Sequence, residues 1–444
     1  MYENKKIFIL GMARSGFEVA KLLSKYNNEI TITDMKEQNE EDVKVLKELG
    51  VNYIVTDKPE ELLDNSYDVL VKNPGIIKSH KCVVKAKELN MKVVNEVEVA
   101  GYFLPDDVKI IGITGSNGKT TTTTLIYNIL EKAGVSPHLG GNIGYPVSSL
   151  VERVKSNDIL VLEISDHQLV DMHDFKTDIS VLTNLYQNHL DFHENSYDNY
   201  KNTKKKIFNG HTSKEIAIIN NGSEDSLKLT DDIPSTKITF SSDVESDICI
   251  KDGYIVYKDD KVINVNDIKL QGKHNYENAM CAIAVCKEFG VSNEIINDIL
   301  TTFGGVEHRI EYVRTLNGRD FYNDSKSTNT DSTVIAVNSF KRPTILIMGG
   351  LDRGHSFDNL NEYMSNVKLV VCYGETKERI NTWCQALGIN CIVKDSLIDA
   401  TNAAYDNSKE NDIILLSPGC ASWDQYKCFE DRGNEFKENV NKLN

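Results

Sequence analysis

The chain has 444 residues, 40% of them hydrophobic, and a formal net charge of −16 at pH 7. This length exceeds what one hydrophobic core supports and predicts about three domains. The negative charge argues against a nucleic-acid-binding surface, because phosphate backbones attract basic patches.

Signals for membranes and secretion are missing from the sequence. No apolar run approaches the ~20 residues of a membrane span, and the opening MYENKK is not typical of a signal peptide. The nine cysteines form no C-x-x-C pair, which is typical of a reduced cytoplasmic protein without structural zinc. We therefore expect a cytoplasmic protein with neither membrane nor nucleic acid as a partner, whose cysteines are nearly all small buried hydrophobes.

The first segment, KKIFILGMARSGFEVAKLL, predicts a strand, a turn with Gly11 and Gly16, and an amphipathic helix. EITITD follows as a second strand that ends at Asp34, where dinucleotide folds place an acid beside a ribose. Ala13 replaces the middle glycine of the dinucleotide fingerprint, so an ordinary βαβ unit without a ligand stays an open alternative. A turn at 72–76, KNPGI, follows the strand YDVLV and is expected at the same sheet edge.

The second segment opens with a strand, then TGSNGKT at 114–120, then apolar residues at helical spacing. In such a loop, backbone N–H groups and a helix N-terminus face phosphate, Lys119 reaches the outer phosphates and the Thr120 hydroxyl binds Mg²⁺. Ile113 replaces a glycine of the common pattern, so a glycine-rich turn that merely starts a buried helix is the alternative. The intact Gly-Lys-Thr favours a nucleoside triphosphate site.

Polar residues at the ends of the next two apolar strands lie at the same predicted edge. Glu163 lies near the end of DILVLEIS, and Thr183–Asn184 end DISVLTNL. A carboxylate facing Gly-Lys-Thr is where an Mg²⁺–ATP site needs an oxygen ligand. His189 and His193 follow in NHLDFH, and without H-E-x-x-H or cysteine partners we expect a hydrogen-bonded structural role for such histidines.

A polar, β-rich insert at 210–270 shows no chemistry. GKHNYENA then begins a helix with Asn275 and Asn278 one turn apart, for which capping alone is an alternative. From Val306 the pattern is again βαβα, with polar turns after apolar strands. These turns carry Asp324, Lys326, Thr328, Gly349–Gly350, Arg353, Ser417 and Ser422.

The predicted fold is α/β with three domains. We expect an N-terminal Rossmann-like domain at 1–98, a central P-loop ATPase-like domain with a mainly parallel sheet at 99–304, and a C-terminal Rossmann-like domain at 305–444.

Taken in order, the motifs resemble the Mur ligase family over essentially the whole chain. They are GMARSG, TGSNGKT, GGNIG, TNLYQNHLDFH, YKNTKKKIF, GKHNYENA, EHRIE, YNDSKSTN, GGLDRG and LLSPGCASWDQYKCFEDRG. The last three are similar to those of the D-glutamate-adding members, and the D-N-P-R stretch of the diaminopimelate-adding and lysine-adding relatives is absent. The resemblance implies an ATP-dependent ligase that adds D-glutamate to UDP-N-acetylmuramoyl-L-alanine through an acyl phosphate, in cytoplasmic peptidoglycan precursor synthesis. We expect a monomer.

The resemblance also implies roles for single residues. The ATP site would comprise Gly115, Ser116, Asn117, Gly118, Lys119, Thr120, Thr121, Asn275, Asn278, Arg309 and Asp324. Two Mg²⁺ sites would use Thr120, Glu163, His189 and Lys204. The catalytic groups would be Lys119, His189, Lys204, His308 and Lys326. The UDP-sugar would contact Ser15, Asp34, Lys36, Asn73, Gly75, Asn142 and Ser165, and the amino acid would contact Lys326, Thr328, Arg353 and Ser422.

For Lys204, the resemblance changes the expected role from a solvated surface lysine to a metal ligand. Lys204-Lys205-Lys206 alone is typical of a solvated basic face. Lys204 matches the lysine that the family carbamylates, and a carbamate is an anion able to bind Mg²⁺ as a carboxylate does.

The chain departs from the family pattern at two places. In Glu163-Ile164-Ser165-Asp166-His167-Gln168-Leu169, Asp166 and His167 replace the usual serine and phenylalanine, which puts contacts to the sugar nucleotide there in doubt. Arg353 stands where a lysine is common, and arginine keeps the charge and adds a bidentate fork. Pairing of Arg353 with Asp352 or Asp358, as a mere brace of the turn, is the alternative.

Three other functions stay open on sequence grounds. Another Mur-type or folylpolyglutamate-type amino-acid ligase would share the same motifs. A P-loop motor or switch would turn over ATP without an acceptor acid. The N-terminal turn is the evidence for the third alternative, an NAD-dependent oxidoreductase. Ala13 in that turn and the better phosphate loop at 114–120 both argue against it.

Overall fold

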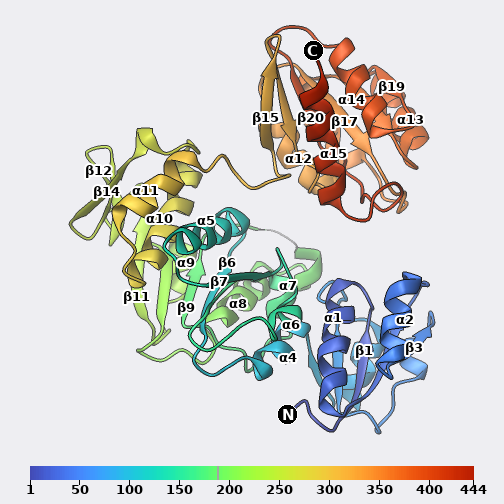
Figure 1. The fold of residues 1–444 in the computed structure, drawn as a ribbon, viewed down its shortest axis with the longest axis vertical. Coiled ribbons are helices and arrows are strands. Elements are labelled where there is room, and N and C mark those ends of the chain that lie inside the picture. The colour runs from blue at the N-terminus through green and yellow to red at the C-terminus, as the bar shows by residue number, and fades with distance from the viewer. Residues whose placement is uncertain (188–189) are drawn as a thin grey trace. The chain divides into compact units, whose positions relative to one another are not determined.

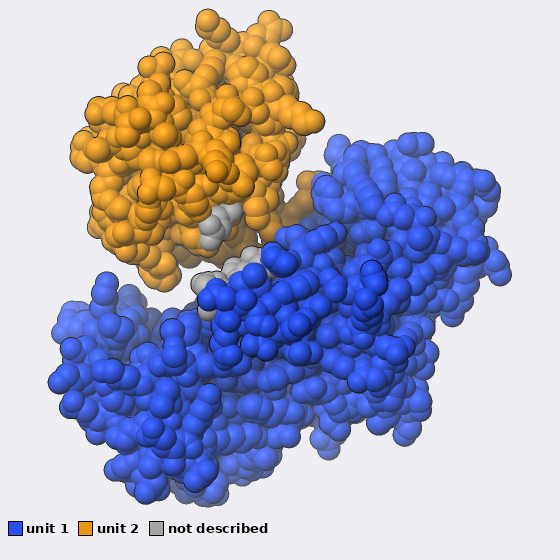
Figure 2. Space-filling model, turned by 180° about the vertical axis from the view of Figure 1, so that it is seen from behind, with its two compact units in different colours: residues 1–303 blue, residues 304–444 orange. Residues whose placement is uncertain are grey.

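The computed structural model describes residues 1–187 and 190–444, except the side chains of Asp191 and Asp331. The chain forms two compact units, Met1–Phe303 and Gly304–Asn444, shown in different colours in Figure 2. Among the described residues, no helix is long and apolar enough to cross a membrane.

The first sheet of unit 1 is a five-stranded parallel sheet with β1 at its centre (Figure 1). Its strands are β1 (Lys6–Leu10), β2 (Glu29–Asp34), β3 (Asn52–Val55), β4 (Val69–Lys72) and β5 (Lys92–Val94), in the order β3-β2-β1-β4-β5. Its helices are α1 (Arg14–Leu23), α2 (Glu40–Glu48), α3 (Lys81–Glu88) and α4 (Glu96–Phe103). Because β2 and β4 flank β1 on opposite sides, the order reverses at β1, which is where open α/β sheets bind ligands.

The second sheet of unit 1 has nine strands in the order β14-β13-β12-β11-β10-β9-β6-β8-β7. They are β6 (Lys109–Thr114), β7 (Pro137–Gly141), β8 (Ile159–Glu163), β9 (Ile179–Leu182), β10 (Ile216–Asn220), β11 (Thr236–Ser241), β12 (Ile248–Lys251), β13 (Tyr254–Tyr257) and β14 (Asp260–Asn264). Strands β6 to β12 pair in parallel, whereas β12, β13 and β14 are antiparallel. The β-rich insert therefore extends the sheet, and Asp252 and Gly253, both with positive φ, form its first hairpin turn.

Helices close both faces of this sheet. They are α5 (Lys119–Lys132), α6 (Val147–Leu150), α7 (Asp166–Leu169), α8 (Tyr197–Lys205), α9 (Glu224–Leu229), α10 (Lys273–Glu288) and α11 (Asn293–Thr302). Five threonines fit into α5 because Thr123 and Thr124 each donate their hydroxyl to the carbonyl four residues back, at 2.8 Å. Leu125, Ile126 and Ile129 of α5 join the buried core beneath.

Unit 2 is a six-stranded sheet that is buried on both faces. Its strands are β15 (Glu311–Leu316), β16 (Arg319–Asn323), β17 (Thr344–Gly349), β18 (Val367–Tyr373), β19 (Cys391–Val393) and β20 (Ile413–Leu416), in the order β15-β16-β20-β17-β18-β19. Its helices are α12 (Thr330–Asn338), α13 (Lys377–Leu387), α14 (Leu397–Asp406) and α15 (Phe429–Lys442). Two separate apolar clusters pack against the sheet, and in the described part of unit 2 only β15 runs antiparallel to its neighbour. The predicted α/β fold with mainly parallel sheets is confirmed.

Candidate active site

Two glycines fix the course of the loop between β6 and α5. Gly115 and Gly118 have φ angles of +146° and +80°. A Cβ atom at Gly115 would lie 2.0 Å from Thr183 Oγ1, and one at Gly118 would lie 2.2 Å from Asn278 Oδ1. Glycine is therefore required at both positions. No side chain caps the N-terminus of α5 in the described structure, so its first N–H groups present an anion-binding end.

Neighbouring segments hold the loop in shape. The Ser116 hydroxyl lies 2.7 Å from the Tyr200 hydroxyl, and the Asn117 N–H donates to Asn184 Oδ1 at 2.8 Å. Lys119 folds back over the loop, where its Nζ donates to the carbonyls of Gly115 and Ser116 at 2.9 and 3.0 Å. A lysine in this position can reach a phosphate seated on the loop without moving its backbone.

The two asparagines of α10 also lie at the phosphate loop. Asn278 is 5% exposed and accepts the Thr122 hydroxyl at 3.3 Å. Its Nδ2 donates to Asn275 Oδ1 at 3.5 Å, and Asn275 donates to the Gln271 carbonyl at 3.0 Å. Neither asparagine is the N-cap of α10, since Gly272 occupies that position.

Glu163 places an unsatisfied carboxylate oxygen beside the loop. In the β6–β8 register it lies opposite Ile113, one residue before Thr114 ends β6. Its Oε1 accepts Asn142 Nδ2 at 2.7 Å, whereas its Oε2 is buried and has no hydrogen-bond partner among the described residues. A buried carboxylate oxygen at the strand end beside the loop that carries Thr120 suits Mg²⁺, a hard cation that prefers oxygen ligands. The donor set therefore fits the metal that the phosphate loop implies.

Lys204 is buried beside the same loop and not on a solvated face. Its side chain is 0% exposed, and its Nζ lies 3.2 Å from Asp166 Oδ1 and 3.4 Å from Thr114 Oγ1. The second oxygen of Asp166 contacts His193 Nε2 at 2.9 Å. Burial and the Lys119 charge lower the pKa of Lys204 to about 7, although Asp166 and Glu163 act in the opposite direction.

Asp166 is the residue of this group that the sequence analysis missed. On sequence grounds it is only a departure from the family pattern, in a stretch expected to contact the sugar nucleotide. The structure places it between two buried nitrogen-bearing side chains, those of Lys204 and His193, both of which are distant from it in the chain. His189, expected to be catalytic and to bind metal, lies outside the described residues.

The residues expected to hold the UDP end gather at the switch point of the first sheet. Asp34 accepts the Met12 and Lys36 N–H groups at 2.9 and 3.2 Å, which ties the β2 end to the β1 turn. Asn73 donates its N–H to the Leu10 carbonyl at 3.0 Å and accepts the Gly75 N–H on its side chain at 3.2 Å. Ser15 lies in the first turn of α1.

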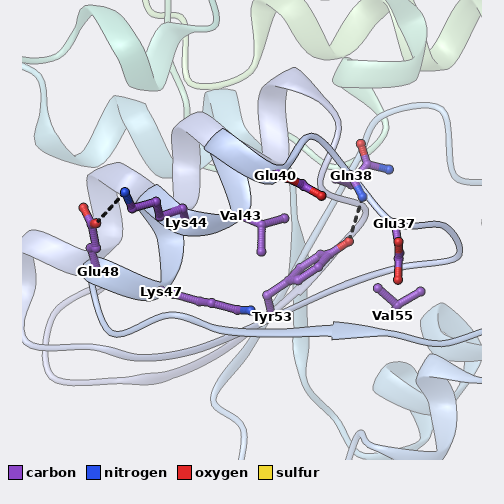
Figure 3. A pocket seen from close by; sticks show the side chains of 9 residues that line it. All are labelled: Glu37, Gln38, Glu40, Val43, Lys44, Lys47, Glu48, Tyr53 and Val55. Atoms are coloured by element: carbon purple, nitrogen blue, oxygen red, sulfur yellow. Dashed lines mark hydrogen bonds and ion pairs between the residues drawn. The ribbon is translucent and has the colours of Figure 1, made fainter.

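Ser165 and Asn142, which are also expected to contact the UDP-sugar, lie beside the second sheet of unit 1 and not at the turns of the first. Ser165 is the N-cap of α7 and forms a reciprocal capping box with Gln168. Asn142 follows the end of the edge strand β7 and donates to Glu163 at the end of the neighbouring β8. A cleft of ≈ 730 Å³ between α2 and β3 contains none of the expected site residues; Glu40, Lys44 and Tyr53 are among those that line it (Figure 3).

In unit 2, His308 and Asp324 are buried close to each other. His308 has a φ of +63° and its Nδ1 lies 2.9 Å from Asn323 Nδ2. Asp324 accepts the Ser417 hydroxyl at 2.7 Å and the Ile310 N–H at 3.1 Å. Burial raises the pKa of Asp324 to about 6 and lowers the pKa of His308. Arg309 acts on Asp324 in the opposite direction, as a nearby positive charge.

The residues expected to hold the amino acid lie on three turns of unit 2. The Lys326 N–H donates to the His308 carbonyl, and the Thr328 N–H donates to the Lys326 carbonyl, both at 2.9 Å. The Arg353 guanidinium stacks over the exposed Trp423 ring at 4.7 Å. Ser422, the neighbour of Trp423, is 2% exposed. The alternative partner Asp352 instead pairs with Arg379.

Arg432 joins these turns, and the sequence analysis did not single it out. Its side chain is fully buried and donates to the Ser325 hydroxyl and carbonyl at 3.0 and 2.8 Å and to the Cys420 carbonyl at 3.0 Å. The motif FEDRG contains it, but no local pattern indicates that its guanidinium turns inward. With a further contact to the Gly349 carbonyl at 3.5 Å, one side chain thereby joins three loops of unit 2.

The loop, the buried acid and the buried lysine define a P-loop nucleotide-binding protein built on three mostly parallel sheets. The Mur ligase middle domain family matches residues 113–286, and the family described as Mur ligase, glutamate ligase domain matches residues 308–420. A UDP-N-acetylmuramoylalanine–D-glutamate ligase from Staphylococcus aureus (strain MW2) is 41% identical over 438 residues, which are 98% of this chain and 96% of the relative. The chain belongs to the Mur ligase family.

Solved structures share the fold at lower identity. The UDP-N-acetylmuramate-alanine ligase MurC of Thermotoga maritima is 18% identical with a TM-score of 0.60, over 98% of this chain and 99% of that one. E. coli FolC, solved with DHPP and ADP, is 16% identical with a TM-score of 0.56, over 78% of this chain and 92% of its own. These two likenesses concern the fold alone.

Proposed function

We propose that this chain is an ATP-dependent ligase that joins D-glutamate to UDP-N-acetylmuramoyl-L-alanine in peptidoglycan precursor synthesis. The observation that carries the proposal is its 41% identity, over nearly the full length of both chains, to a D-glutamate ligase of this kind. The phosphate loop with its buried Glu163 supplies the site at which such an enzyme needs ATP.

The reaction class follows from the groups that the chain offers. ATP transfers its γ-phosphoryl group to the carboxylate of the sugar-peptide, and the amine of D-glutamate then displaces phosphate to form an amide. Lys119 and the first N–H groups of α5 hold the phosphates, which stabilises the charge that develops during transfer. Thr120 and Glu163 would hold Mg²⁺, which when bound neutralises phosphate charge.

We infer that Lys204 carries a carbamate in the active enzyme. Its amine must be neutral to take up carbon dioxide, and burial lowers its pKa to about 7, so a large neutral fraction exists near neutral pH. A carbamate on Lys204 would place an anionic oxygen near Thr114 and Glu163, as a further ligand for the metal. The ion pair with Asp166 has to open when this modification forms, because the two groups would then both be anions.

We propose the remaining assignments in the same terms. Ser15, Asp34, Lys36, Asn73, Gly75, Asn142 and Ser165 would contact the UDP-sugar. Asn275 and Asn278 would lie near the adenine, Arg309 and Asp324 near the ribose and phosphates, and His308 and Lys326 near the acyl phosphate. Lys326, Thr328, Arg353 and Ser422 would hold D-glutamate, and His189 would bind a second Mg²⁺. The domains would divide at 98/99 and 304/305, in a cytoplasmic monomer that binds no nucleic acid.

Two cations suit a substrate with two carboxylates. Lys326 and Arg353 would each face one carboxylate of glutamate, and a substrate with a single carboxylate would leave one of them unpaired. An unpaired polar group in a binding site is what makes such sites selective. The preference for the D configuration comes from the relative and not from the donor set.

Phosphate release from ATP tests the proposal. We expect release only when UDP-N-acetylmuramoyl-L-alanine and D-glutamate are both present, and little with L-glutamate, D-alanine, L-lysine or diaminopimelate. The Lys119→Ala variant should keep less than about a tenth of the activity, because loss of one phosphate donor typically costs about 10²-fold or more. Release without an acceptor acid would favour a switch or motor, and preference for another amino acid would favour a different ligase.

A further inference from the structure

Three of the nine cysteines converge in unit 2, although they are scattered in the sequence. Cys372 lies on β18, Cys384 on α13 and Cys391 on β19. The sulfurs of Cys372 and Cys391 are 3.5 Å apart, and Cys384 lies near Cys391 as well. Cys391 is thus the shared centre of a thiol cluster, which we name the β18–β19 thiol cluster.

Exposure separates the three thiols into two kinds. Cys372 and Cys384 are both 0% exposed, whereas Cys391 is only partly buried. A small oxidant in solvent therefore meets Cys391 first, and the buried Cys372 is already in contact with its sulfur. This is the arrangement of redox-sensitive thiols, in which an accessible cysteine lies beside a resolving one.

The cluster is linked, through the loop after β18, to the turn that the proposed function assigns to the amino acid. The Cys372 thiol donates to the Lys377 carbonyl at 3.3 Å, at the start of α13. One residue earlier, Thr376 donates both its N–H and its hydroxyl to the Gly350 carbonyl at 3.1 Å. The Glu375 carboxylate accepts the Asp352 N–H at 3.2 Å. The loop after β18 therefore supports the turn that carries Arg353.

We propose that the β18–β19 thiol cluster is an oxidative modification site, in which a peroxide converts Cys391 and Cys372 into a disulfide. In the first step the Cys391 thiol attacks hydrogen peroxide, giving a sulfenic acid and one water. In the second step the Cys372 thiol attacks the Cys391 sulfur, the S–S bond forms, and the hydroxyl leaves as a second water. Two thiols are oxidised and one peroxide is reduced, so atoms and electrons balance.

The register of β18 and β19 indicates that this disulfide would require the strands and the following loop to move. Cys372 pairs with Val393 and Cys391 pairs with Val370, so the two cysteines are diagonal neighbours on adjacent parallel strands. To form a bond of about 2.05 Å, the sulfurs must close from 3.5 Å. The bond also removes the donor to the Lys377 carbonyl. We expect the loop at 374–376 to shift with Cys372, and the disulfide to be easily reduced because its geometry is strained.

Peptide mapping tests the proposal directly. Cleavage after lysine and arginine places Cys372 in peptide 369–377, and both Cys384 and Cys391 in peptide 380–394. After treatment of the full-length protein with hydrogen peroxide, we expect a species about 2 Da lighter than the reduced protein. It should contain the cross-linked pair of these two peptides, fragmentation should place the bond at Cys391, and dithiothreitol should reverse it.

Matched variants separate this bond from general oxidation. Cys391→Ser and Cys372→Ser should each abolish the cross-link, whereas Cys428→Ser, which removes another partly buried cysteine of unit 2, should leave it intact. Three results would overturn the proposal: a disulfide between Cys384 and Cys391 within peptide 380–394, a disulfide between Cys372 and Cys384, or stepwise oxygen addition without any cross-link. None of these readouts depends on the enzyme's activity.

A second readout rests on the proposed function. In the oxidised protein we expect kcat/KM for D-glutamate to fall about tenfold, since small displacements of positioning groups cost this much or more, while the KM for ATP stays unchanged. The Cys372→Ser variant should keep its activity in peroxide. Equal loss of activity in this variant and in the unmodified chain would contradict the link between the cluster and the turn.

Discussion

The two units each bury a cation completely, and the two cations behave differently. Lys204 in unit 1 contacts the Asp166 carboxylate and has a pKa lowered to about 7 by burial. Arg432 in unit 2 is surrounded by carbonyl and hydroxyl oxygens and keeps its charge, because a guanidinium does not lose its proton in proteins. A titratable cation beside a phosphate loop is suited to chemistry, whereas a permanent one is suited to holding loops in place.

The largest effect should come from removing the titratable cation. We expect Lys204→Ala to lower kcat by about 10²-fold or more, because a group at the phosphate site contributes to stabilising developing charge. Lys205→Ala is the matched control: Lys205 is partly exposed, pairs with Asp232 at the surface, and should change kcat by less than about twofold. Steady-state kinetics checks both.

A folding defect has to be separated from this loss. Lys204→Ala leaves Asp166 buried without its cation, so the double variant Asp166→Asn/Lys204→Ala should regain stability but not activity. If the double variant regained activity, the catalytic role of Lys204 would be refuted.

The next effect concerns the permanent cation and appears in stability. Arg432→Lys cannot reproduce the fork that contacts Ser325 and Cys420, and we expect the unfolding free energy of unit 2 to fall by about 3 kcal/mol. Both tryptophans, Trp383 and Trp423, lie in unit 2. Their fluorescence during urea unfolding therefore reports on this unit.

Arg342 offers a control within the same unit. It pairs with Asp320 at 2.5 Å, but its side chain is 38% exposed. Arg342→Lys should cost less than about 1 kcal/mol in the same experiment. Equal losses for Arg342→Lys and Arg432→Lys would mean that the buried contacts of Arg432 contribute nothing special.

The third prediction is a pH dependence to which Lys204 contributes. Its pKa is lowered from 10.5 to about 7 in the folded chain, so the unfolded chain binds more protons between these two values. Stability of unit 1 should therefore rise with pH across this range. The slope should be smaller in the Lys204→Ala variant, as measured by urea unfolding followed by circular dichroism. Arg432→Lys should leave this slope unchanged.

The smallest effect should arise at a third cation, Arg353, which is exposed and stacks on Trp423. We expect Arg353→Ala to raise the KM for D-glutamate far more than the KM for ATP. Trp423→Ala should raise it only about twofold to fivefold, because an exposed cation–π contact contributes about 0.5–1 kcal/mol, and Trp423→Phe should lie between this variant and the unmodified chain. An unchanged KM for D-glutamate in Arg353→Ala would contradict the assigned pocket.

The features that the sequence predicts are those whose signal is local. The phosphate loop, Glu163 at its strand end and the alternation of strands and helices depend on spacing within a few residues, and the structure has them. Asp166, Arg432 and the thiol cluster depend on partners 38, 107 and 19 positions away. No periodicity encodes such pairs. Lys204 is an instructive case, because its neighbours suggested a solvated face until the resemblance, and then the fold, placed it inside.

The contact between Gly118 and Asn278 has a consequence for how the protein is made. Asn278 accepts the hydroxyl of Thr122, which precedes it by 156 positions. A ribosome delivers the phosphate loop early and the helix that presses against it much later. A nascent chain that ends before α10 thus has a glycine-rich loop that lacks its contacts with Asn278. We expect nucleotide binding only after more than half of the protein has been synthesised.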